Sequence, residues 1–340
     1  MHTDTDQSNE ISLFKLKNKN GLQVEISNFG GVIKSIFTPD KNGKFDDIIL
    51  GYDTINPYLD NPAFMGCIVG RYANRIDQGT FEIDRKRYQL DLNNGNCSLH
   101  GGVNAPFHKA LWKVGESNES LLKLTHKSKS MEDGFPGNLD LTVTYSLSDL
   151  NELMIKYEAQ TDEKTVINLT NHSYFNLNGG KSSILNHYLS IDSESFHPTN
   201  KDQIPLTEES VSGTPFDFRQ PKLIGAQIND HHDQIKLAEG YDHNWIINPQ
   251  LNGIKKVATL FEKESGRKMD VKTDQPGIQV YTGNHVNMTG KKGQKYSKHW
   301  GICLETQHYP NSPNRPDFPT TLLEPGKHFE TTTIFSFGLI

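Results

Sequence analysis

Apolar and polar residues alternate along most of this chain, which is the two-residue period of β-strands with one buried face. Between Glu10 and Phe37 turn-forming residues at 18–21 interrupt the alternation once, and this predicts an opening hairpin. Similar runs recur between clusters of glycine, asparagine, aspartate and serine, at 47–50, 81–90, 111–114, 121–125, 140–146 and 153–160. Helical periodicity is confined to two short stretches, around Tyr58 and at 223–228. We therefore expect an all-β fold, a large antiparallel β-sandwich or closed sheet.

The run Gly301–Gln307 is a short predicted strand that leads into a loop with prolines at 310, 313, 316 and 319. Proline ends the sheet because it lacks a backbone N–H and fixes φ. With strand geometry, Ile302 and Leu304 point inward, while Cys303 and Glu305 point outward on a polar face. Glu305 is then a carboxylate beside a stiff loop, a favourable place for chemistry, although an exposed strand glutamate without a role gives the same pattern.

Two further predicted strands also gather their polar residues on one face. In the run 166–177 that face consists of Asn168, Thr170, His172, Tyr174 and Asn176. In the run 277–283 it carries Gln279 and Tyr281. For any one of these strands, a solvent-exposed sheet face is the more common explanation. Three of them together predict the floor of a polar pocket.

Three predicted loops add candidate binding groups. His100 directly precedes two glycines, which let a backbone approach a ligand closely. Asn74 and Arg75 follow Gly70 in a second loop, and Asp242 lies in a third loop that enters a strand. None of these is specific alone, since a single histidine is more often structural and an arginine is usually on the surface.

Composition narrows the classes of partner. The 340 residues fit one large β domain, which we favour over two smaller ones. The net charge of -6, from 35 basic and 41 acidic residues mixed along the chain, provides no basic stripe for a phosphate backbone and no polybasic membrane patch. We expect neither nucleic acid nor membrane as a partner.

The cysteines and the N-terminus predict a cytoplasmic location. Cys67, Cys97 and Cys303 form an odd, sparse set without a Cys-x-x-Cys pair, which is typical of a reducing compartment. The first residues are polar and acidic, unlike a signal peptide, and no run of eighteen apolar residues follows.

Taken together, these residues make the sequence resemble the aldose 1-epimerase family, the galactose mutarotases. The motifs span most of the chain in the family's order: Gly70-Arg71-x-Ala73-Asn74-Arg75-Ile76, Leu99-His100-Gly101-Gly102, Asn171-His172-Ser173-Tyr174-Phe175-Asn176-Leu177, Tyr241-Asp242-His243-Asn244, Gln275-Pro276-Gly277-x-Gln279 and Leu304-Glu305-Thr306-Gln307. In combination they are highly specific. The resemblance implies one domain over residues 1–340, a galactose mutarotase-like supersandwich that binds a free aldose on its open face.

The resemblance also implies roles for individual residues. Glu305 is expected to act as the general base and His172 as the general acid. The residues expected to hold the hydroxyls and ring oxygen of the sugar are Asn74, Arg75, His100, Asp242 and Gln279. Ser173 and Tyr174 are expected beside the acid as further substrate-binding residues.

The residue types suit such a reaction independently of the name. Anomer interconversion removes the proton of the C1 hydroxyl and protonates the ring oxygen, which requires one base and one acid. Desolvation raises a glutamate pKa from about 4.3 and a histidine pKa starts near 6.5, so the pair can hold opposite protonation states around neutrality. No electrons move, so we expect no cofactor. We also expect no metal, because no motif such as His-Glu-x-x-His occurs and the pair His231-His232 is predicted to lie in a solvated loop.

Other functions stay open in the sequence. A glycosidase could use Glu305 with Asp242 if their separation suited it. A non-catalytic carbohydrate-binding sandwich would also have a polar face, usually with exposed aromatic platforms.

Within the same fold, a hexose-6-phosphate 1-epimerase is the runner-up. A phosphate site normally gathers several basic groups, and here only Arg75, with Arg71 as a possible second, opposes two carboxylates. We therefore expect an unphosphorylated monosaccharide such as galactose or glucose as the substrate. We expect a monomer or a weak homodimer.

Overall fold

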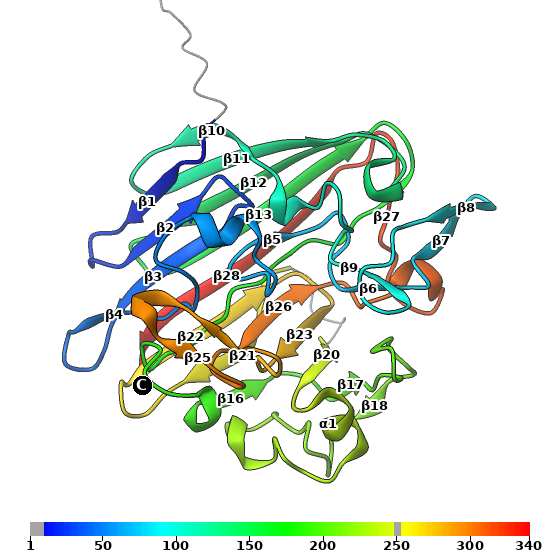
Figure 1. The fold of residues 1–340 in the computed structure, drawn as a ribbon. Helices are drawn as coiled ribbons and strands as arrows, with labels where there is room; N and C mark the ends of the chain where they lie inside the picture. Colours follow the sequence, from blue (N-terminus) through cyan, green and yellow to red (C-terminus); the bar gives the residue numbers. More distant parts are fainter. Residues whose placement is uncertain (1–9, 248–252) are drawn as a thin grey trace, which may run out of the picture.

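The structure, a computed structural model, describes residues 10–247 and 253–340, and its regular secondary structure consists almost entirely of antiparallel strands (Figure 1). The polar N-terminal residues 1–9 lie outside the described ranges. The prediction of an all-β antiparallel fold is confirmed. No helix in the described ranges is long and apolar enough to cross a membrane. That residues 1–340 form a single domain stays a prediction.

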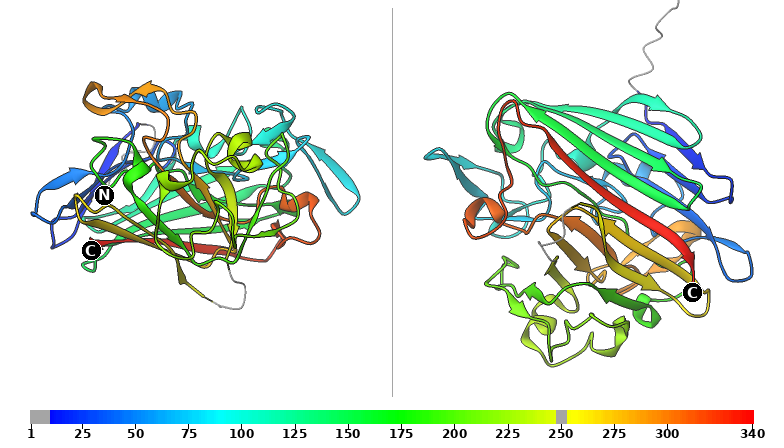
Figure 2. Two further views of the ribbon diagram at one scale, coloured as in Figure 1. Left: turned by 90° about the horizontal axis from the view of Figure 1, so that it is seen from below. Right: turned by 180° about the vertical axis from the view of Figure 1, so that it is seen from behind.

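Nine strands form one large layer, which faces the viewer in the right panel of Figure 2. In spatial order they are β10 (Lys113–Ser117), β11 (Leu121–Ser128), β12 (Leu139–Leu147), β13 (Glu152–Thr161), β28 (Phe329–Leu339), β22 (Arg267–Thr273), β21 (Lys255–Phe261), β16 (Tyr188–Ile191) and β19 (Lys222–Leu223). Residues of β12 and β13 are alternately buried and partly exposed, so one face of the layer meets the core and the other meets water.

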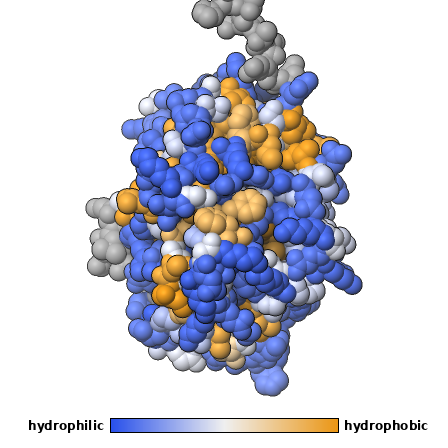
Figure 3. Space-filling view, turned by 90° about the vertical axis from the view of Figure 1, so that its left-hand side faces the viewer, coloured by the Kyte–Doolittle hydropathy of each residue, from blue (hydrophilic) through white to orange (hydrophobic). Residues whose placement is uncertain are grey.

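Smaller sheets cover the inner face of this layer, as the left panel of Figure 2 shows. One contains β1 (Leu13–Lys17), β2 (Gln23–Ser27), β3 (Ile33–Pro39) and β4 (Phe45–Asp47). The other contains β18 (Glu209–Ser210), β17 (Ser195–His197), β20 (Asp242–Ile246), β23 (Gly277–Tyr281) and β26 (Cys303–Gln307). The pairing of β1 with β2 confirms the predicted opening hairpin. The side of the molecule that carries β1 to β4 is hydrophilic over most of its area (Figure 3).

Short elements complete the fold. Five two-stranded pairs are β14 (Thr165–Val166) with β27 (Leu322–Leu323), β15 (Thr170–Asn171) with β5 (Ile68–Val69), β24 (Met288–Thr289) with β25 (Lys295–Tyr296), β6 (Arg75–Asp77) with β9 (Cys97–Leu99), and β7 (Thr80–Ile83) with β8 (Lys86–Gln89). The 3₁₀ turns are η1 (Asn56–Leu59), η2 (Phe107–Lys109), η3 (Glu132–Gly134), η4 (Ile184–Asn186), η5 (Ile224–Ala226), η6 (Lys291–Gly293) and η7 (Ser312–Asn314).

The helix predictions were only partly right. Both predicted stretches contain just a single 3₁₀ turn, η1 and η5. The α-helix of the described ranges is α1 (Asp233–Ala238), directly after His232, whose side chain accepts a hydrogen bond from the backbone N–H of Gln234. The histidine pair 231–232 lies in the loop before this helix, as expected, with His231 exposed and His232 partly exposed as the N-cap of α1.

A continuous apolar core lies between the layers. Val143 of β12 and Ile155 of β13 are fully buried on one side. Val280 of β23 and Leu304 of β26 belong to the same cluster on the other. Burial of this surface is the main favourable term in folding, and it fixes which face of β23 and β26 turns away from the core.

The strand that carries Glu305 is covered on both faces. All five residues of β26 are buried, so the predicted solvent-facing side of this strand was wrong. The segment 166–177 runs along its free edge through the Phe175–Ile302 bridge and a hydrogen bond from Thr170 Oγ1 to the carbonyl of Thr306. The prediction of one continuous strand over 166–177 was wrong. Only 165–166 and 170–171 form regular strand pairs. Because the segment 166–177 runs antiparallel to β26, His172 lies opposite Glu305.

Arg71 anchors the loop that carries the Asn74-Arg75 motif. Its guanidinium is buried and donates hydrogen bonds to the carbonyls of Pro136 and Gly137 and to the hydroxyl of Ser128. The side chain therefore points into the protein, where it is not free to bind a phosphate.

Arg71→Ala should lower the free energy of unfolding by about 3 kcal/mol, because it leaves buried carbonyl groups unpaired and opens a cavity. Urea denaturation followed by circular dichroism measures the change. The control is Arg219→Ala, which removes partly exposed ion pairs with Asp217 and Glu194 and should lower the free energy of unfolding much less. Equal losses in the two variants would contradict the structural role of Arg71.

Candidate active site

A pocket of about 280 Å³ brings together most of the predicted site residues. Those that line it are Asn74, Arg75, His100, His172, Tyr174, Asp242 and Glu305. They come from chain segments far apart in the sequence, and Asp242 and Glu305 lie on β20 and β26, on either side of β23 (Figure 1). A wider hollow of about 650 Å³ on β10 to β13 is lined mainly by partly exposed polar side chains, without a comparable buried pair.

Glu305 lies at the bottom of this pocket and is 2% exposed. Burial, and after it the charge of Asp242, raises the pKa of Glu305 well above its usual range. The charge of Arg75 acts in the opposite direction and lowers this pKa. Glu305 Oε2 is buried and accepts no hydrogen bond from any described residue, so it is available to a ligand.

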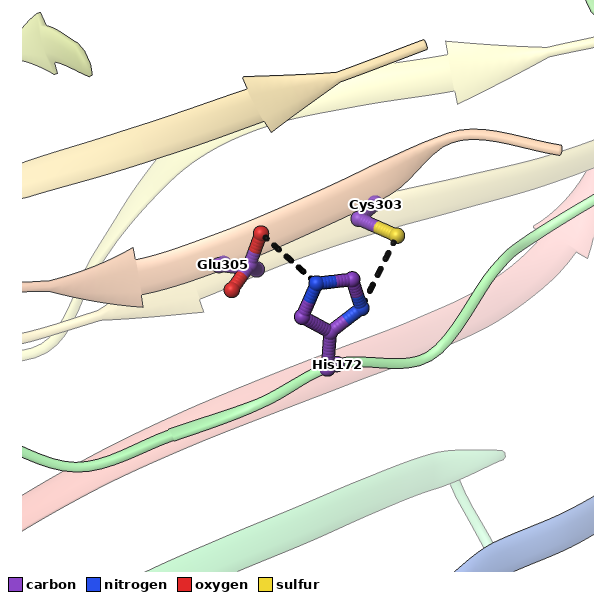
Figure 4. A group of neighbouring side chains, drawn as sticks. All are labelled: His172, Cys303 and Glu305. Atoms are coloured by element: carbon purple, nitrogen blue, oxygen red, sulfur yellow. Dashed lines mark hydrogen bonds and ion pairs between the residues drawn. The ribbon is translucent and has the colours of Figure 1, made fainter. Parts of the chain in front are cut away.

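His172 faces Glu305 across a gap of 3.8 Å between Nε2 and Oε1 (Figure 4). Burial lowers the pKa of His172 to about 4. Desolvation therefore favours the uncharged form of both groups, a protonated carboxyl group and a neutral imidazole. The gap is too long for a direct hydrogen bond, so a group placed between the two can contact both.

Two backbone turns fix the rim opposite this pair. Asn74 and His100 both adopt left-handed φ, at 64° and 54°. The backbone N–H of Asn74 donates to His100 Nδ1, and the N–H of His100 donates to the carbonyl of Asn74. Burial first, and then His172 and Arg75, lowers the pKa of His100 well below its usual value. Since its Nδ1 accepts, neutral His100 carries its proton on Nε2 as a donor.

Arg75 is held by two amide side chains. Its Nε donates to Asn94 Oδ1 over 3.0 Å, and an Nη2 hydrogen bond reaches Gln203 Oε1. Asn94 and Gln203 also line the pocket.

Gln279 and Ser173 do not line the pocket. Gln279 pairs with Glu305 in the β23–β26 ladder, and its Nε2 donates to Asp242 Oδ1 over 2.7 Å, so it orients Asp242. The hydroxyl of Ser173 is buried and donates to Asn171 Oδ1. Tyr174, by contrast, lines the pocket and donates its hydroxyl proton to the carbonyl of Ala63.

Several residues of the site were not predicted. Phe64, Asn94 and Gln203 line the pocket from loops whose sequences carry no distinguishing signal. Tyr281 also lines it, and its place on the polar face of the predicted strand 277–283 was a usable signal. Cys303 contacts His172, and alternation had already placed it on the same face as Glu305.

The cluster of His172, Cys303 and Glu305 has the side chains of a metal site but not its geometry. Their ligand atoms lie within 4.8 Å of one another. However, the imidazole stands between the other two and presents Nδ1 to the sulfur and Nε2 to the carboxyl group (Figure 4). The three donors therefore do not converge on one point, as a metal ion requires.

Comparison with known proteins places this site in a family. The family described as Aldose 1-epimerase matches residues 12–336. The galactose mutarotase of Bos taurus is 41% identical over 325 residues, which cover 94% of this chain and 92% of that protein. The aldose 1-epimerase of Escherichia coli K12 is 34% identical, with 96% and 94% covered.

A solved structure agrees. The crystal structure of a GalM/aldose epimerase homologue from C. elegans superposes with a TM-score of 0.90 at 29% identity, and the match covers 97% of this chain and all of that one.

Proposed function

The chain belongs to the aldose 1-epimerase family, and on that basis we propose that Glu305 is the general base and His172 the general acid of its reaction. The protein is an isomerase that interconverts the α and β anomers of aldoses. The observation that carries the assignment of roles is the buried pair itself, with Nε2 and Oε1 3.8 Å apart in a sugar-sized pocket.

The reaction moves two protons in each direction. Glu305 takes the proton of the C1 hydroxyl while His172 gives its Nε2 proton to the ring oxygen. The bond from C1 to the ring oxygen breaks, and C1 becomes the carbonyl of the open-chain aldose. After rotation about C1–C2, the C5 hydroxyl attacks the other face of C1. It returns its proton to His172 as Glu305 returns the first proton to O1.

The protonation states follow from this cycle. With a closed ring in the pocket, Glu305 is a carboxylate and His172 an imidazolium. With the open-chain sugar, Glu305 is a neutral carboxylic acid and His172 a neutral imidazole. In both states the two side chains together carry one exchangeable proton. Burial favours the neutral pair, so the dry pocket favours the state that accompanies ring opening. Arg75, which lowers the pKa of Glu305, helps to restore the carboxylate for the closed ring.

The remaining groups are suited to holding a neutral sugar. His100 offers an Nε2 donor, Asn74 lines the pocket beside it, and Arg75 offers further N–H donors. Asp242, oriented by Gln279, can accept hydrogen bonds from sugar hydroxyls. We assign these contacts to the substrate, with Tyr174 as part of the wall. Ser173 would act through Asn171.

The substrate we propose is a free aldose such as galactose or glucose. A pocket of about 280 Å³ lies at the small end of ligand sites, which suits a monosaccharide. Arg75 is the single arginine or lysine among the residues that line it, against the carboxyl groups of Glu305 and Asp242. Arg71, the second candidate for a phosphate, is buried among backbone carbonyls. The relatives named galactose mutarotase support this choice.

The alternatives from other classes fit less well. Membership of an isomerase family argues against a glycosidase and against a non-catalytic sugar-binding module. A glycosidase would also pair Glu305 with a second carboxylate, whereas here an imidazole is its partner at 3.8 Å.

Glu305→Gln should lower kcat for mutarotation about 10²- to 10⁴-fold and leave sugar binding nearly unchanged, since the amide keeps the shape but cannot take the C1 proton. His172→Asn should be similarly impaired, because the ring oxygen loses its proton donor. Polarimetry of freshly dissolved α-glucose or α-galactose measures both. The matched control is Glu262→Gln, a buried glutamate outside the pocket, which should keep wild-type kcat. Near-wild-type rates in Glu305→Gln would refute the base.

The dependence of kcat/KM on pH should be bell-shaped, with a broad plateau. As the pH falls through about 4, His172 becomes protonated while Glu305 still carries its proton. Neither group can then accept a proton, so kcat/KM falls. As pH rises through the raised pKa of Glu305, the pair loses its last exchangeable proton, and the rate falls again. Asp242→Asn should move the alkaline limb to lower pH, since the charge of Asp242 raises this pKa. An unshifted alkaline limb would argue against Glu305 as its source.

Glucose should be a better substrate than glucose 6-phosphate by kcat/KM. In a partly desolvated pocket, repulsion between the phosphate and the carboxylates of Glu305 and Asp242 should cost more free energy than attraction to Arg75 contributes. Polarimetry at equal concentrations, corrected for each spontaneous rate, makes the comparison. A higher value for the phosphate would overturn this choice of substrate and leave the acid–base pair intact.

A further inference from the structure

Cys303 contacts the nitrogen of His172 that faces away from Glu305. Its sulfur lies 3.4 Å from Nδ1, and both side chains are buried (Figure 4). Cys303 and Glu305 are two residues apart on β26, so their side chains leave the same face of the strand. The imidazole therefore meets the carboxyl group with Nε2 and the thiol with Nδ1.

The proposed reaction uses Nε2 of His172 twice. As an imidazolium it gives the Nε2 proton to the ring oxygen, and as a neutral ring it takes a proton back at the same atom. Between these steps the one proton of the neutral ring must lie on Nδ1. Which nitrogen of a neutral imidazole is protonated depends on the hydrogen bond that the other makes. The Nδ1–H group therefore needs an acceptor throughout the cycle.

We propose that Cys303 is a positioning residue for His172, in which the sulfur accepts a hydrogen bond from Nδ1–H and so confines proton exchange to Nε2. This inference rests on the proposed role of His172 as the general acid. Cys303 touches neither the reacting atoms nor the sugar in this account. It acts through the imidazole alone.

A thiol suits this position better than the carboxylate that often supports a catalytic histidine. Sulfur is a weak acceptor, so it orients the Nδ1–H group without greatly stabilising the imidazolium. His172 then stays acidic enough to protonate a weakly basic ring oxygen. Burial raises the pKa of Cys303 well above its usual range, which keeps the sulfur uncharged.

The surroundings of the ring supply one other acceptor, the backbone carbonyl of His172 itself, which raises the pKa of His172 against the larger lowering by burial. The titratable and charged groups around His172 are Cys303 and Glu305 of β26, Tyr281 of β23, Asp242 of β20, Tyr174, His100, His108, Cys67 and Arg75. Of these, the sulfur of Cys303 is the group that the described structure places within hydrogen-bonding distance of Nδ1.

Kinetics of cysteine variants test the proposal. Cys303→Ala should lower kcat about threefold to tenfold with little change in KM, the size expected for one modest hydrogen bond. Cys303→Ser, which keeps an acceptor, should recover most of the loss. The matched control is Cys67→Ala, which opens a similar cavity in the same apolar cluster and should not change the ratio of kcat to KM or the pH profile. If Cys303→Ala behaves like Cys67→Ala, Cys303 only fills space and the proposal is wrong.

A measurement on the wild-type enzyme avoids any problem with folding. Nitrogen NMR of protein labelled at histidine identifies which ring nitrogen carries the proton, and the His172 signals are those lost in His172→Asn. We expect neutral His172 to be protonated at Nδ1. A proton on Nε2 with a bare Nδ1 would overturn the proposal. If His172→Asn were fully active, the proposed function itself would fail, whereas an inactive His172→Asn with an unaffected Cys303→Ala would sink only the role of Cys303.

Discussion

Glu305 is almost fully buried, opposite a buried imidazole, and the rest of the site depends on this burial. A charged carboxylate and a charged imidazolium are both costly there, so the uncharged pair is favoured. In the proposed reaction, a closed sugar ring between them requires the costly state, and the open-chain sugar relieves the cost. Under this proposal the pocket contributes to ring opening through the energy of its own two side chains. Asp242 and Arg75 adjust that energy in opposite directions.

The fold provides this burial through the edge of one strand. β26 ends a five-stranded sheet, and the irregular segment 166–177 lies along its free edge. A regular strand there would extend the sheet, whereas residues 170–171 pair with β5 instead and His172 faces Glu305. Hydrogen bonds from the side chains of Asn168 and Thr170 to the carbonyls of His308 and Thr306 keep the segment in register. The large apolar core behind β26 keeps the opposite face closed to water.

The alternation of residues predicted strands that have one face in the core, such as β12 and β13, and it placed Glu305, Gln279 and Tyr281 on polar faces. It did not predict β16, β21, β22 and β28 of the large layer. The motifs added His172 and the loop residues around it. What alternation cannot tell is whether a polar face meets water or is covered, because covering depends on contacts between distant segments; β26 was misjudged for this reason. For the same reason, the sequence did not predict that Arg71 points into the protein, that the hydroxyl of Ser173 is buried, or that a short helix follows His232.

The short gap between Nε2 of His172 and Oε1 of Glu305 has a consequence for how the enzyme begins each new turnover. In the proposed reaction every proton taken from the sugar is given back to it before the product leaves, so the enzyme ends the cycle in the state in which it started. No recharging step through bulk water is needed, and either anomer can enter next. A site of this kind can remain closed to solvent without becoming slower, which removes the usual conflict between a dry active site and one that must be reset.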